Sequence, residues 1–400
     1  MNTMKRRVRR THTTVVGVIA LLGLLSPMAA LAQQGVAAPY AFLDPLREHF
    51  APDRRLTVFD VTAAVEEGRL VLKGEVETTE ARDAVVAAAR KAGYEQVVDK
   101  MLVLPDPSLG PDRVGMVTVS VANLRAKPAH SSELVTQAVM GVEVSALYRA
   151  GGWLYVRAGA ERYLGWVEDG QVALTNPDGL EGWRRSPRLM VTAPFALVRE
   201  GADPGALPVS DVVAGGTLRH ENDKDGWFRV TLPDGRAGYL EPGAALPFDR
   251  WRVAYAPTAD GVERTALQFM GVPYLWGGTS AKGFDCSGYT KTVFRLHGIE
   301  LARDADQQAV EGDAVPLDQG YGPFRKGDLL FFTARPTPDR SGAITHVGIY
   351  LGAGEFVHAS GRVKRNSFDP ASPIYSENLL KRLAGVRRVL PEPSPTSASR

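Results

Sequence analysis

The segment Gly283-Phe284-Asp285-Cys286-Ser287-Gly288 contains Cys286, the only cysteine in the 400-residue chain. From Tyr289 onward, apolar side chains recur at i, i+4 and i+7, and Gly298 ends the run, which predicts a helix. Cys286 then lies at or near the helix N-terminus, where unpaired N–H groups and the helix dipole favour a thiolate, the nucleophilic form of cysteine. The alternative is an inert buried cysteine, because free cysteine is among the most buried residue types.

A second region supplies candidate bases for such a thiol. Two alternating runs, 345–351 and 355–360, flank a glycine-rich centre, which predicts a β-hairpin. His346 and His358 lie six residues before and six after Gly352, so the hairpin would place them directly opposite each other on one face. One imidazole could then orient the other while the latter deprotonates the thiol. A lone strand histidine is usually structural, but two in register with one cysteine favour catalysis.

Residues 1–32 have the organisation of a secretory signal peptide. Basic residues from Lys5 to Arg10 precede an apolar run at 15–25, and Ala30-Leu31-Ala32 is a small-x-small cleavage site. A membrane anchor is the alternative, but the run is shorter than the ~20 residues of a span. We therefore expect an exported protein, periplasmic or extracellular, without a stable membrane span after cleavage.

Charge and cysteine usage narrow the function further. The chain has 47 basic and 45 acidic residues, and losing the five basic residues of 1–32 leaves 42 against 45, a formal charge of −3. This balance argues against nucleic acid as a partner. A single cysteine cannot form an internal disulfide, and an unpaired thiol is a liability in an oxidising compartment, so its presence favours a chemical role.

Proline-rich stretches divide the rest of the chain. Residues 33–52 are predicted to be a linker or arm, and residues 55–105 a small α+β module. The predicted elements of this module are strands at 56–61 and 70–76, a helix at 80–92 and a strand at 97–104. Their order resembles a BON domain, a module of bacterial envelope proteins, although a generic α+β module fits equally well.

Residues 114–175 are predicted to form a small β-barrel, because short strands alternate with glycine-rich turns. The predicted strands are 116–121, 134–139, 143–147, 153–156 and 164–167. The pieces Asn123-Leu124-Arg125-Ala126-Lys127-Pro128, Gly152-Trp153-x-x-Val156 and Gly165-Trp166-Val167 resemble bacterial SH3 domains. Residues 187–246 repeat the scheme, with Trp227 placed 74 positions after Trp153, so we expect a tandem pair. Ligand binding by these two tryptophans is an alternative to core packing, the commoner role of tryptophan.

Residues 251–390 are predicted to form the domain that holds Cys286. A helix is expected at 262–269 and a strand at 327–332, followed by an insert at 333–343 before the histidine hairpin. Residues 391–400 are rich in proline and serine and are predicted to be disordered.

Four motifs in this domain occur together. They are Pro273-Tyr274-x-Trp276-Gly277-Gly278, Asp285-Cys286-Ser287-Gly288, Gly327-Asp328-Leu329 and His346-Val347-Gly348-Ile349-Tyr350. In this order and spacing they closely resemble the NlpC-type cysteine peptidases of bacterial cell walls, and the two SH3-like segments upstream match an arrangement of that family. The resemblance implies a papain-like α+β fold and cleavage of peptidoglycan stem peptides between γ-D-glutamate and a diamino acid, meso-diaminopimelate or L-lysine. It implies no metal or cofactor.

The resemblance also implies roles for single residues. Cys286 would be the nucleophile, His346 the base and His358 the residue that orients it. Tyr274 looks like the family tyrosine beside the thiolate. The residues resembling those that hold the L-Ala end of the substrate are Asp285 and Ser287.

In relatives with upstream SH3 domains, acidic and tyrosine side chains of the first domain close the site and recognise a free α-amino group. By resemblance, Tyr163 with Glu161 is the candidate pair, and the enzyme would select released stem peptides over intact polymer. Arg303 and Asp304 fit the family pattern, whereas Ala305 stands where some relatives have serine, so one substrate hydrogen bond is in doubt.

Two other functions fit parts of the pattern. The SH3-like repeats suit a non-catalytic protein that binds the cell wall. Cys286, His346 and His358 are also residue types that bind Zn²⁺, although they lack the local spacing typical of zinc ligands.

Overall fold

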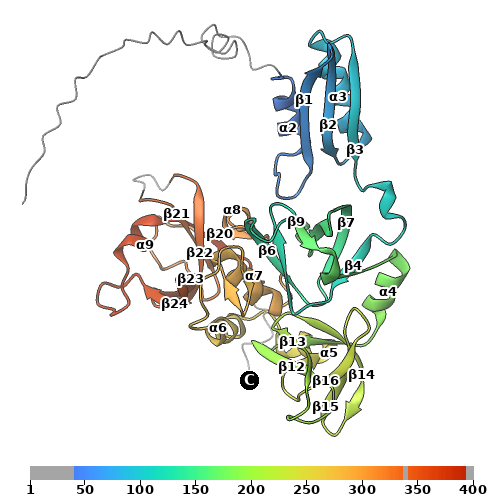
Figure 1. Ribbon diagram of the computed structural model, residues 1–400. Helices are drawn as coiled ribbons and strands as arrows, with labels where there is room; N and C mark the ends of the chain where they lie inside the picture. Colours follow the sequence, from blue (N-terminus) through green and yellow to red (C-terminus); the bar gives the residue numbers. More distant parts are fainter. Residues whose placement is uncertain (1–39, 337–340, 393–400) are drawn as a thin grey trace, which may run out of the picture.

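The computed structural model describes residues 40–336 and 341–392 (Figure 1). A three-stranded sheet comes first, two seven-stranded sheets follow, and a six-stranded sheet with a two-stranded one completes the described chain. The predicted signal peptide at 1–32, part of the predicted insert and most of the predicted tail lie outside the described residues. No helix within the described ranges is long and apolar enough to cross a membrane.

The elements of the N-terminal module are the two strands, helix and third strand predicted for it, preceded by a helix that was not predicted, α2. They are α2 (Leu43–Phe50), β1 (Phe59–Glu66), β2 (Arg69–Val76), α3 (Thr79–Lys91) and β3 (Val97–Val103). Strand β2 pairs antiparallel with β1 and parallel with β3, and α3 makes the crossover between β2 and β3. Val85 and Ala89 of α3 are fully buried against the sheet.

Helix α2 lies within 33–52, so the predicted linker is wrong at 43–50. The prolines of this segment suggested a linker or arm, but Pro45 occupies the first turn of the helix, where proline is tolerated. Leu43 is buried, and the ring of Phe50 stacks on that of Phe59, with 6.1 Å between centroids. The apolar face of α2 therefore covers the sheet of this module.

The first seven-stranded sheet follows a short 3₁₀ turn at Pro107–Leu109. Its strands are β4 (Val114–Val117), β5 (Val121–Arg125), β6 (Leu134–Val139), β7 (Glu143–Ala150), β8 (Trp153–Ala158), β9 (Tyr163–Glu168) and β10 (Val172–Thr175), with a 3₁₀ turn at Asp169–Gln171. The single strand predicted at 116–121 is wrong, because the chain leaves β4 and enters β5 across 118–120.

The second seven-stranded sheet begins after α4 (Pro177–Arg185). Its strands are β11 (Arg188–Val191), β12 (Phe195–Arg199), β13 (Pro208–Val213), β14 (Thr217–Lys224), β15 (Trp227–Thr231), β16 (Ala237–Leu240) and β17 (Ala245–Pro247). The order β17-β11-β14-β15-β16-β12-β13 repeats the order β10-β4-β7-β8-β9-β5-β6 of the first sheet, each strand replaced by the one seven places later. Trp153 and Trp227 are both buried, as expected for core side chains.

The C-terminal module combines helices with a mixed set of short and long strands. Its helices are α5 (Phe248–Ala254), α6 (Ala259–Gln268), α7 (Cys286–Leu296), α8 (Ala305–Gln308) and α9 (Glu377–Arg382). Its strands are β18 (Thr279–Ser280), β19 (Gly283–Phe284), β20 (Asp313–Ala314), β21 (Leu329–Thr333), β22 (Ile344–Gly352), β23 (Glu355–Ser360), β24 (Arg362–Ser367) and β25 (Leu383–Arg388). The sheet order is β20-β25-β21-β22-β23-β24.

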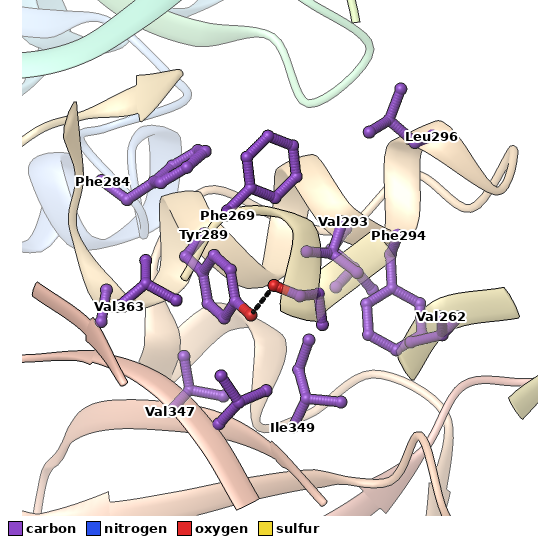
Figure 2. Close-up of a cluster of buried hydrophobic side chains, with 14 of the residues drawn as sticks. Val262, Phe269, Phe284, Tyr289, Val293, Phe294, Leu296, Val347, Ile349 and Val363 are labelled. Carbon is purple, nitrogen blue, oxygen red and sulfur yellow. Dashed lines mark hydrogen bonds between the residues drawn. The ribbon is translucent and has the colours of Figure 1, made fainter. Parts of the chain in front are cut away.

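Helix α7 is the central helix of this module (Figure 2). Tyr289, Val293 and Leu296, which carry the predicted helical period, are fully buried, so the predicted helix is confirmed. They share one core with Val347 and Ile349 of β22. This packing fixes the start of α7 beside the strand that carries His346.

Candidate active site

Cys286 is the first residue of α7. The carboxylate of Asp285 caps the helix, because its Oδ1 accepts the N–H of Gly288 at 2.7 Å. The thiol is mostly buried and interacts with the backbone N–H groups of Ser287 and Val347. The sulfur therefore lies against the peptide that joins His346 to Val347.

The histidine hairpin forms, but with a different register from the predicted one. Its turn residues are Ala353 and Gly354, both at positive φ (48° and 79°), as a two-residue type I′ turn requires. An irregularity between Tyr350 and Gly352 shifts the pairing, so Ile349 lies opposite Val357. The prediction that the two histidines face each other directly is therefore wrong, since continuing this register places Gly348 opposite His358.

The two histidines are diagonal neighbours on one face of the sheet. A Cβ added to Gly348 would lie only 3.1 Å from the Cβ of His358, so the glycine leaves room between the rings. His346 Nε2 lies 2.6 Å from His358 Nδ1, and the rings meet edge to face at 77°. The two imidazole rings thus make contact diagonally, whereas the sequence predicted contact between directly opposed positions.

Asn366 on β24 determines how protons are distributed along this pair. Its Nδ2 donates to the carbonyl oxygen of Ile374 at 3.0 Å, which orients the amide. Its Oδ1 then accepts from His358 Nε2 at 2.9 Å, so His358 Nδ1 is left as an acceptor for the Nε2–H of His346. In this arrangement the lone pair of His346 is on Nδ1. Sequence reasoning missed Asn366, because nothing indicated a strand at 362–367.

Burial keeps both imidazoles and the thiol neutral in the resting site. It lowers the pKa of His346 to about 3, with the neighbouring His358 as a further cause, and lowers the pKa of His358 to about 4. It raises the pKa of the Cys286 thiol to about 11. Either charge alone is costly here, whereas transfer of the thiol proton to His346 creates two opposite charges that stabilise each other.

Asp285, Ser287 and Arg303 form an internal network next to Cys286. Arg303 is 1% exposed, and its Nη1 and Nη2 reach the two carboxylate oxygens of Asp285 at 3.1 and 2.5 Å. Its Nη1 also donates to Ser287 Oγ at 3.1 Å, and its Nε donates to Thr136 Oγ1 of β6 at 2.7 Å. The predicted substrate residues Asp285 and Ser287 are thus held mainly by the protein, and they fix the start of α7.

Tyr274 lies beside the thiol. Burial raises the pKa of its hydroxyl to about 12, and the neighbouring Cys286 and Asp285 act in the same direction. The hydroxyl is therefore a hydrogen-bond donor at neutral pH. Trp276, two residues later, is 64% exposed, and its Nε1 donates to Glu133 Oε1 at 2.9 Å. Glu133 is an acidic residue of the first seven-stranded module that the sequence analysis did not identify.

The structure brings one member of the predicted SH3 pair to the site. Tyr163 Oη donates to Asp304 Oδ2 at 2.9 Å, and burial raises the pKa of this tyrosine. Glu161 lies elsewhere, because its carboxylate pairs with Lys291 Nζ at 3.2 Å on a later turn of α7. The pairing of Tyr163 with Asp304 across two modules replaces the predicted pairing of Tyr163 with Glu161.

The first seven-stranded module is docked firmly on the catalytic one. Gln137 of β6 accepts hydrogen bonds from Thr279 N and Ser280 Oγ, both at 3.1 Å, through its Oε1. Its carbonyl oxygen accepts from Thr279 Oγ1 at 2.9 Å. Strand β6 therefore forms a wall next to the segment that leads into α7.

Within the described ranges, no group of three or more histidine, cysteine or acidic residues is arranged to hold a metal ion. The zinc hypothesis needs both imidazoles to direct nitrogens at one point. Instead, His346 Nε2 faces His358 Nδ1 at 2.6 Å, and the other nitrogen of His358 faces Asn366. The geometry is that of a hydrogen-bonded relay.

Three family profiles match separate parts of the chain. The NlpC/P60 family matches residues 271–388, the bacterial dipeptidyl-peptidase Sh3 domain matches 124–172, and the BON domain matches 45–105. The BON match begins inside the predicted linker, in agreement with the position of α2.

Individual proteins match over most of the chain. A γ-D-glutamyl-L-lysine dipeptidyl-peptidase of Bacillus cereus is 31% identical over 271 residues, 66% of this chain and 77% of that protein. Dipeptidyl-peptidase 6 of Lysinibacillus sphaericus is 31% identical over 288 residues, 68% of this chain and 97% of that protein. The crystal structure of an NlpC/P60 family protein from Bacillus cereus aligns with a TM-score of 0.59 and 27% identity, covering 70% of this chain and all of that one.

Proposed function

The chain belongs to the NlpC/P60 family, and we propose that it is an exported cysteine endopeptidase that hydrolyses peptidoglycan stem peptides between γ-D-glutamate and a diamino acid. The observation that carries the proposal is the relay His346–His358–Asn366, whose first member adjoins the peptide against which the Cys286 sulfur lies. The two relatives named for γ-D-glutamyl-L-lysine or dipeptidyl-peptidase activity support the choice of bond.

The proposed reaction begins with proton transfer from Cys286 Sγ to His346 Nδ1. The thiolate attacks the γ-carbonyl carbon, and the carbonyl π electrons move to oxygen. The backbone N–H of Cys286 and the hydroxyl of Tyr274 are the proposed donors to this oxyanion, each worth about 3–4 kcal/mol. His346 then gives its proton to the departing amine of the diamino acid, which leaves a thioester on Cys286.

Hydrolysis of the thioester completes the cycle. With the amine gone, His346 Nδ1 is again a base and takes a proton from water as the water attacks the acyl carbon. Cys286 leaves as a thiolate and recovers its proton from His346. His358 remains a hydrogen-bond acceptor throughout and stabilises the charged His346, and Asn366 keeps His358 in the required tautomer.

We propose that Asp304 and Tyr163 receive the free amino end of the L-Ala residue of the substrate. Asp304 is partly exposed, and it shares a hydrogen bond with Tyr163 of the first seven-stranded module. An ammonium group would be attracted by the carboxylate and could also be accepted by the phenol oxygen. This placement supports a preference for released stem peptides over intact polymer.

The remaining modules suit a protein that acts in the cell envelope. The repeated strand order of the two seven-stranded sheets supports a tandem pair of SH3-like domains, of which the first matches a peptidase-associated family. The basic, apolar and small-residue order of residues 1–32 supports export. We therefore propose a periplasmic or extracellular location.

The test is product analysis on defined peptides. The mature protein is incubated with L-Ala-γ-D-Glu-L-Lys and with the meso-diaminopimelate tripeptide, and products are identified by mass spectrometry. We expect the dipeptide L-Ala-D-Glu and the free diamino acid, and no product with Cys286→Ala. Turnover that persists in Cys286→Ala would refute the thiol mechanism. Binding to isolated sacculi without hydrolysis of any peptide would favour the alternative, a non-catalytic wall-binding protein.

A further inference from the structure

A loop of the N-terminal module reaches the catalytic module. It lies between α2 and β1 and carries Arg55, which contacts residues 249 and 251 positions later in the sequence. In Figure 1 the N-terminal module stands above the first seven-stranded sheet, and the loop at its lower end lies next to α8. None of the catalytic roles proposed above uses this loop.

The guanidinium of Arg55 makes five hydrogen bonds, all to carboxylates. Nε and Nη2 donate to Asp53 at 2.9 and 2.8 Å. Nη1 donates to Asp304 Oδ2 at 2.9 Å and to Asp306 Oδ1 at 2.9 Å, and Nη2 donates to Asp306 Oδ2 at 2.9 Å. Since arginine has five N–H donors, this guanidinium is fully satisfied.

Arg55 and Tyr163 converge on the same oxygen. Asp304 Oδ2 accepts from Arg55 Nη1 at 2.9 Å and from Tyr163 Oη at 2.9 Å. The other oxygen, Oδ1, faces the buried Arg303 at 3.8 Å. A cation that is to bind Asp304 at Oδ2 must therefore displace Arg55.

The loop is anchored on both sides of this point. Asp53 Oδ2 accepts from Gln307 Nε2 of α8 at 2.7 Å, and the carbonyl oxygen of Arg55 accepts from the N–H of Leu164 on β9 at 2.9 Å. Leu164 also packs with Val58 and Leu104 of the N-terminal module. These contacts hold the loop in place, and with it the guanidinium of Arg55.

We propose that Arg55 is an intramolecular competitor of the terminal ammonium group of the substrate, and that the docked N-terminal module thereby sets selectivity among stem peptides by their amino end. The inference rests on the proposed function in taking Asp304 and Tyr163 as the residues that receive that end. A tethered group acts at an effective concentration in the millimolar range, so a free ammonium group competes at a disadvantage. A peptide with an acylated amino end has no such group and is indifferent to Arg55.

Steady-state kinetics on two matched peptides test the proposal in the mature full-length protein. The substrates are L-Ala-γ-D-Glu-L-Lys and its N-acetyl form. In Arg55→Ala we expect KM for the free-amine peptide to fall by about fivefold or more, the range typical of coupling between two sites, while kcat and the KM of the acetylated peptide stay unchanged. An unchanged or increased KM for the free-amine peptide in Arg55→Ala overturns the proposal.

Two further variants make the result specific. Arg54→Ala is the matched control, because Arg54 is exposed and its carboxylate partner, Asp60 at 4.0 Å, belongs to its own module. It should leave both KM values unchanged. Asp306→Asn weakens the ion pair between Asp306 and Arg55 and leaves Asp304 unchanged, so it should also lower the KM of the free-amine peptide. This variant tests the proposal if Arg55→Ala fails to fold. A change in Arg54→Ala as large as that in Arg55→Ala would contradict the assignment.

A binding measurement separates this proposal from the proposed function. Calorimetry with the free-amine peptide compares Cys286→Ala with the double variant Cys286→Ala/Arg55→Ala, neither of which requires turnover. Tighter binding by the double variant supports competition even if the wild-type protein hydrolyses nothing. Equal binding refutes it even if hydrolysis is efficient.

Discussion

Asn366 Oδ1 lies 2.9 Å from His358 Nε2, and this contact determines which ring nitrogens of His358 and His346 carry protons. The amide cannot turn over without losing the hydrogen bond from its Nδ2 to the carbonyl oxygen of Ile374. His358 consequently presents a lone pair to His346, whose own lone pair is then available at Nδ1. His358, the proposed orienting residue, is thus itself oriented by Asn366, which lies outside the predicted triad of Cys286, His346 and His358.

Replacing Asn366 should therefore impair catalysis more than binding. Asn366→Ala removes one hydrogen bond of a buried histidine, worth about 1–3 kcal/mol, which corresponds to a loss in kcat of roughly 5- to 150-fold. KM should change little, because Asn366 contacts no proposed substrate group. Initial-rate measurements on the tripeptide give both constants.

Two variants distinguish orientation from simple loss of structure. Asn366→Asp keeps an acceptor at this position and should recover part of kcat, and its charge should raise the pKa of His358 and move the acid limb of the rate profile to higher pH. Asn378→Ala, an exposed asparagine on α9, is the control and should behave like the wild type. Equal kcat in Asn366→Ala and the wild type would contradict the assignment.

The pH dependence of kcat/KM should show an acid limb well below pH 6.5. Burial lowers the pKa of His346 to about 3, so the base stays unprotonated on acidification past the ordinary imidazole range. Activity is present above the folded-state pKa and is lost as the pH falls through it. Rates on the tripeptide between pH 4 and pH 8 test this, and half-maximal activity at or above pH 6.5 would show that His346 titrates as an exposed imidazole.

The same lowered pKa values have a consequence for stability. In the unfolded chain both histidines titrate near their ordinary value of 6.5, whereas in the folded protein the pKa is about 3 for His346 and about 4 for His358. Between the folded-state pKa values and 6.5, the unfolded state thus binds more protons than the folded state. The free energy of unfolding therefore decreases as the pH falls from about 6.5 toward 4. Thermal unfolding should show a smaller acid-induced decrease in Tm for His346→Gln/His358→Gln than for the wild type, and an equal decrease would contradict this contribution.

Local pattern predicted much of the site. The helical period after Cys286 and the glycines around residue 352 were sufficient for the start of α7 and for a hairpin with both histidines on one face. The register was not predictable, because the irregularity between Tyr350 and Gly352 depends on how the turn and the strands twist together. Even so, a shift by two residues preserves the face of a strand, which is why the contact between the rings survives.

Contacts between modules left no signal in the sequence. Arg55 meets Asp304 across 249 positions, and neither residue belongs to a periodic pattern that singles it out. Helix α2 was missed because the prolines of 33–52 suggested a linker or arm, although proline is compatible with the first turn of a helix. Glu161 was paired with Tyr163 by resemblance to the family, but the turn before β9 directs it toward Lys291.

Arg303 should be important for stability because it is a buried cation with a buried partner. Its removal in Arg303→Met leaves Asp285 charged and unpaired, at a cost of about 3–5 kcal/mol in the free energy of unfolding. Arg303→Met/Asp285→Asn removes both charges and should be less destabilised than the sum of its single variants. Urea unfolding measures the free energy of unfolding of each variant.

The control Arg325→Met breaks an exposed pair with Glu392 and should cost under about 1 kcal/mol. Additive effects of Arg303→Met and Asp285→Asn would show that the pair is not coupled.

The reactivity of Cys286 should depend on His346 at neutral pH. Burial raises the pKa of the thiol to about 11, so without a proton acceptor little thiolate forms at pH 7.5. Alkylation by iodoacetamide should therefore slow by about tenfold or more in His346→Ala, the factor that corresponds to one pKa unit in thiolate population. His220→Ala, on β14 of the second seven-stranded sheet, is the control and should react like the wild type. Mass spectrometry of the alkylated protein gives the rates, and the difference between His346→Ala and wild type should vanish as the pH approaches 11, where the thiol ionises without help. Equal rates at pH 7.5 would mean that His346 does not accept the proton of Cys286.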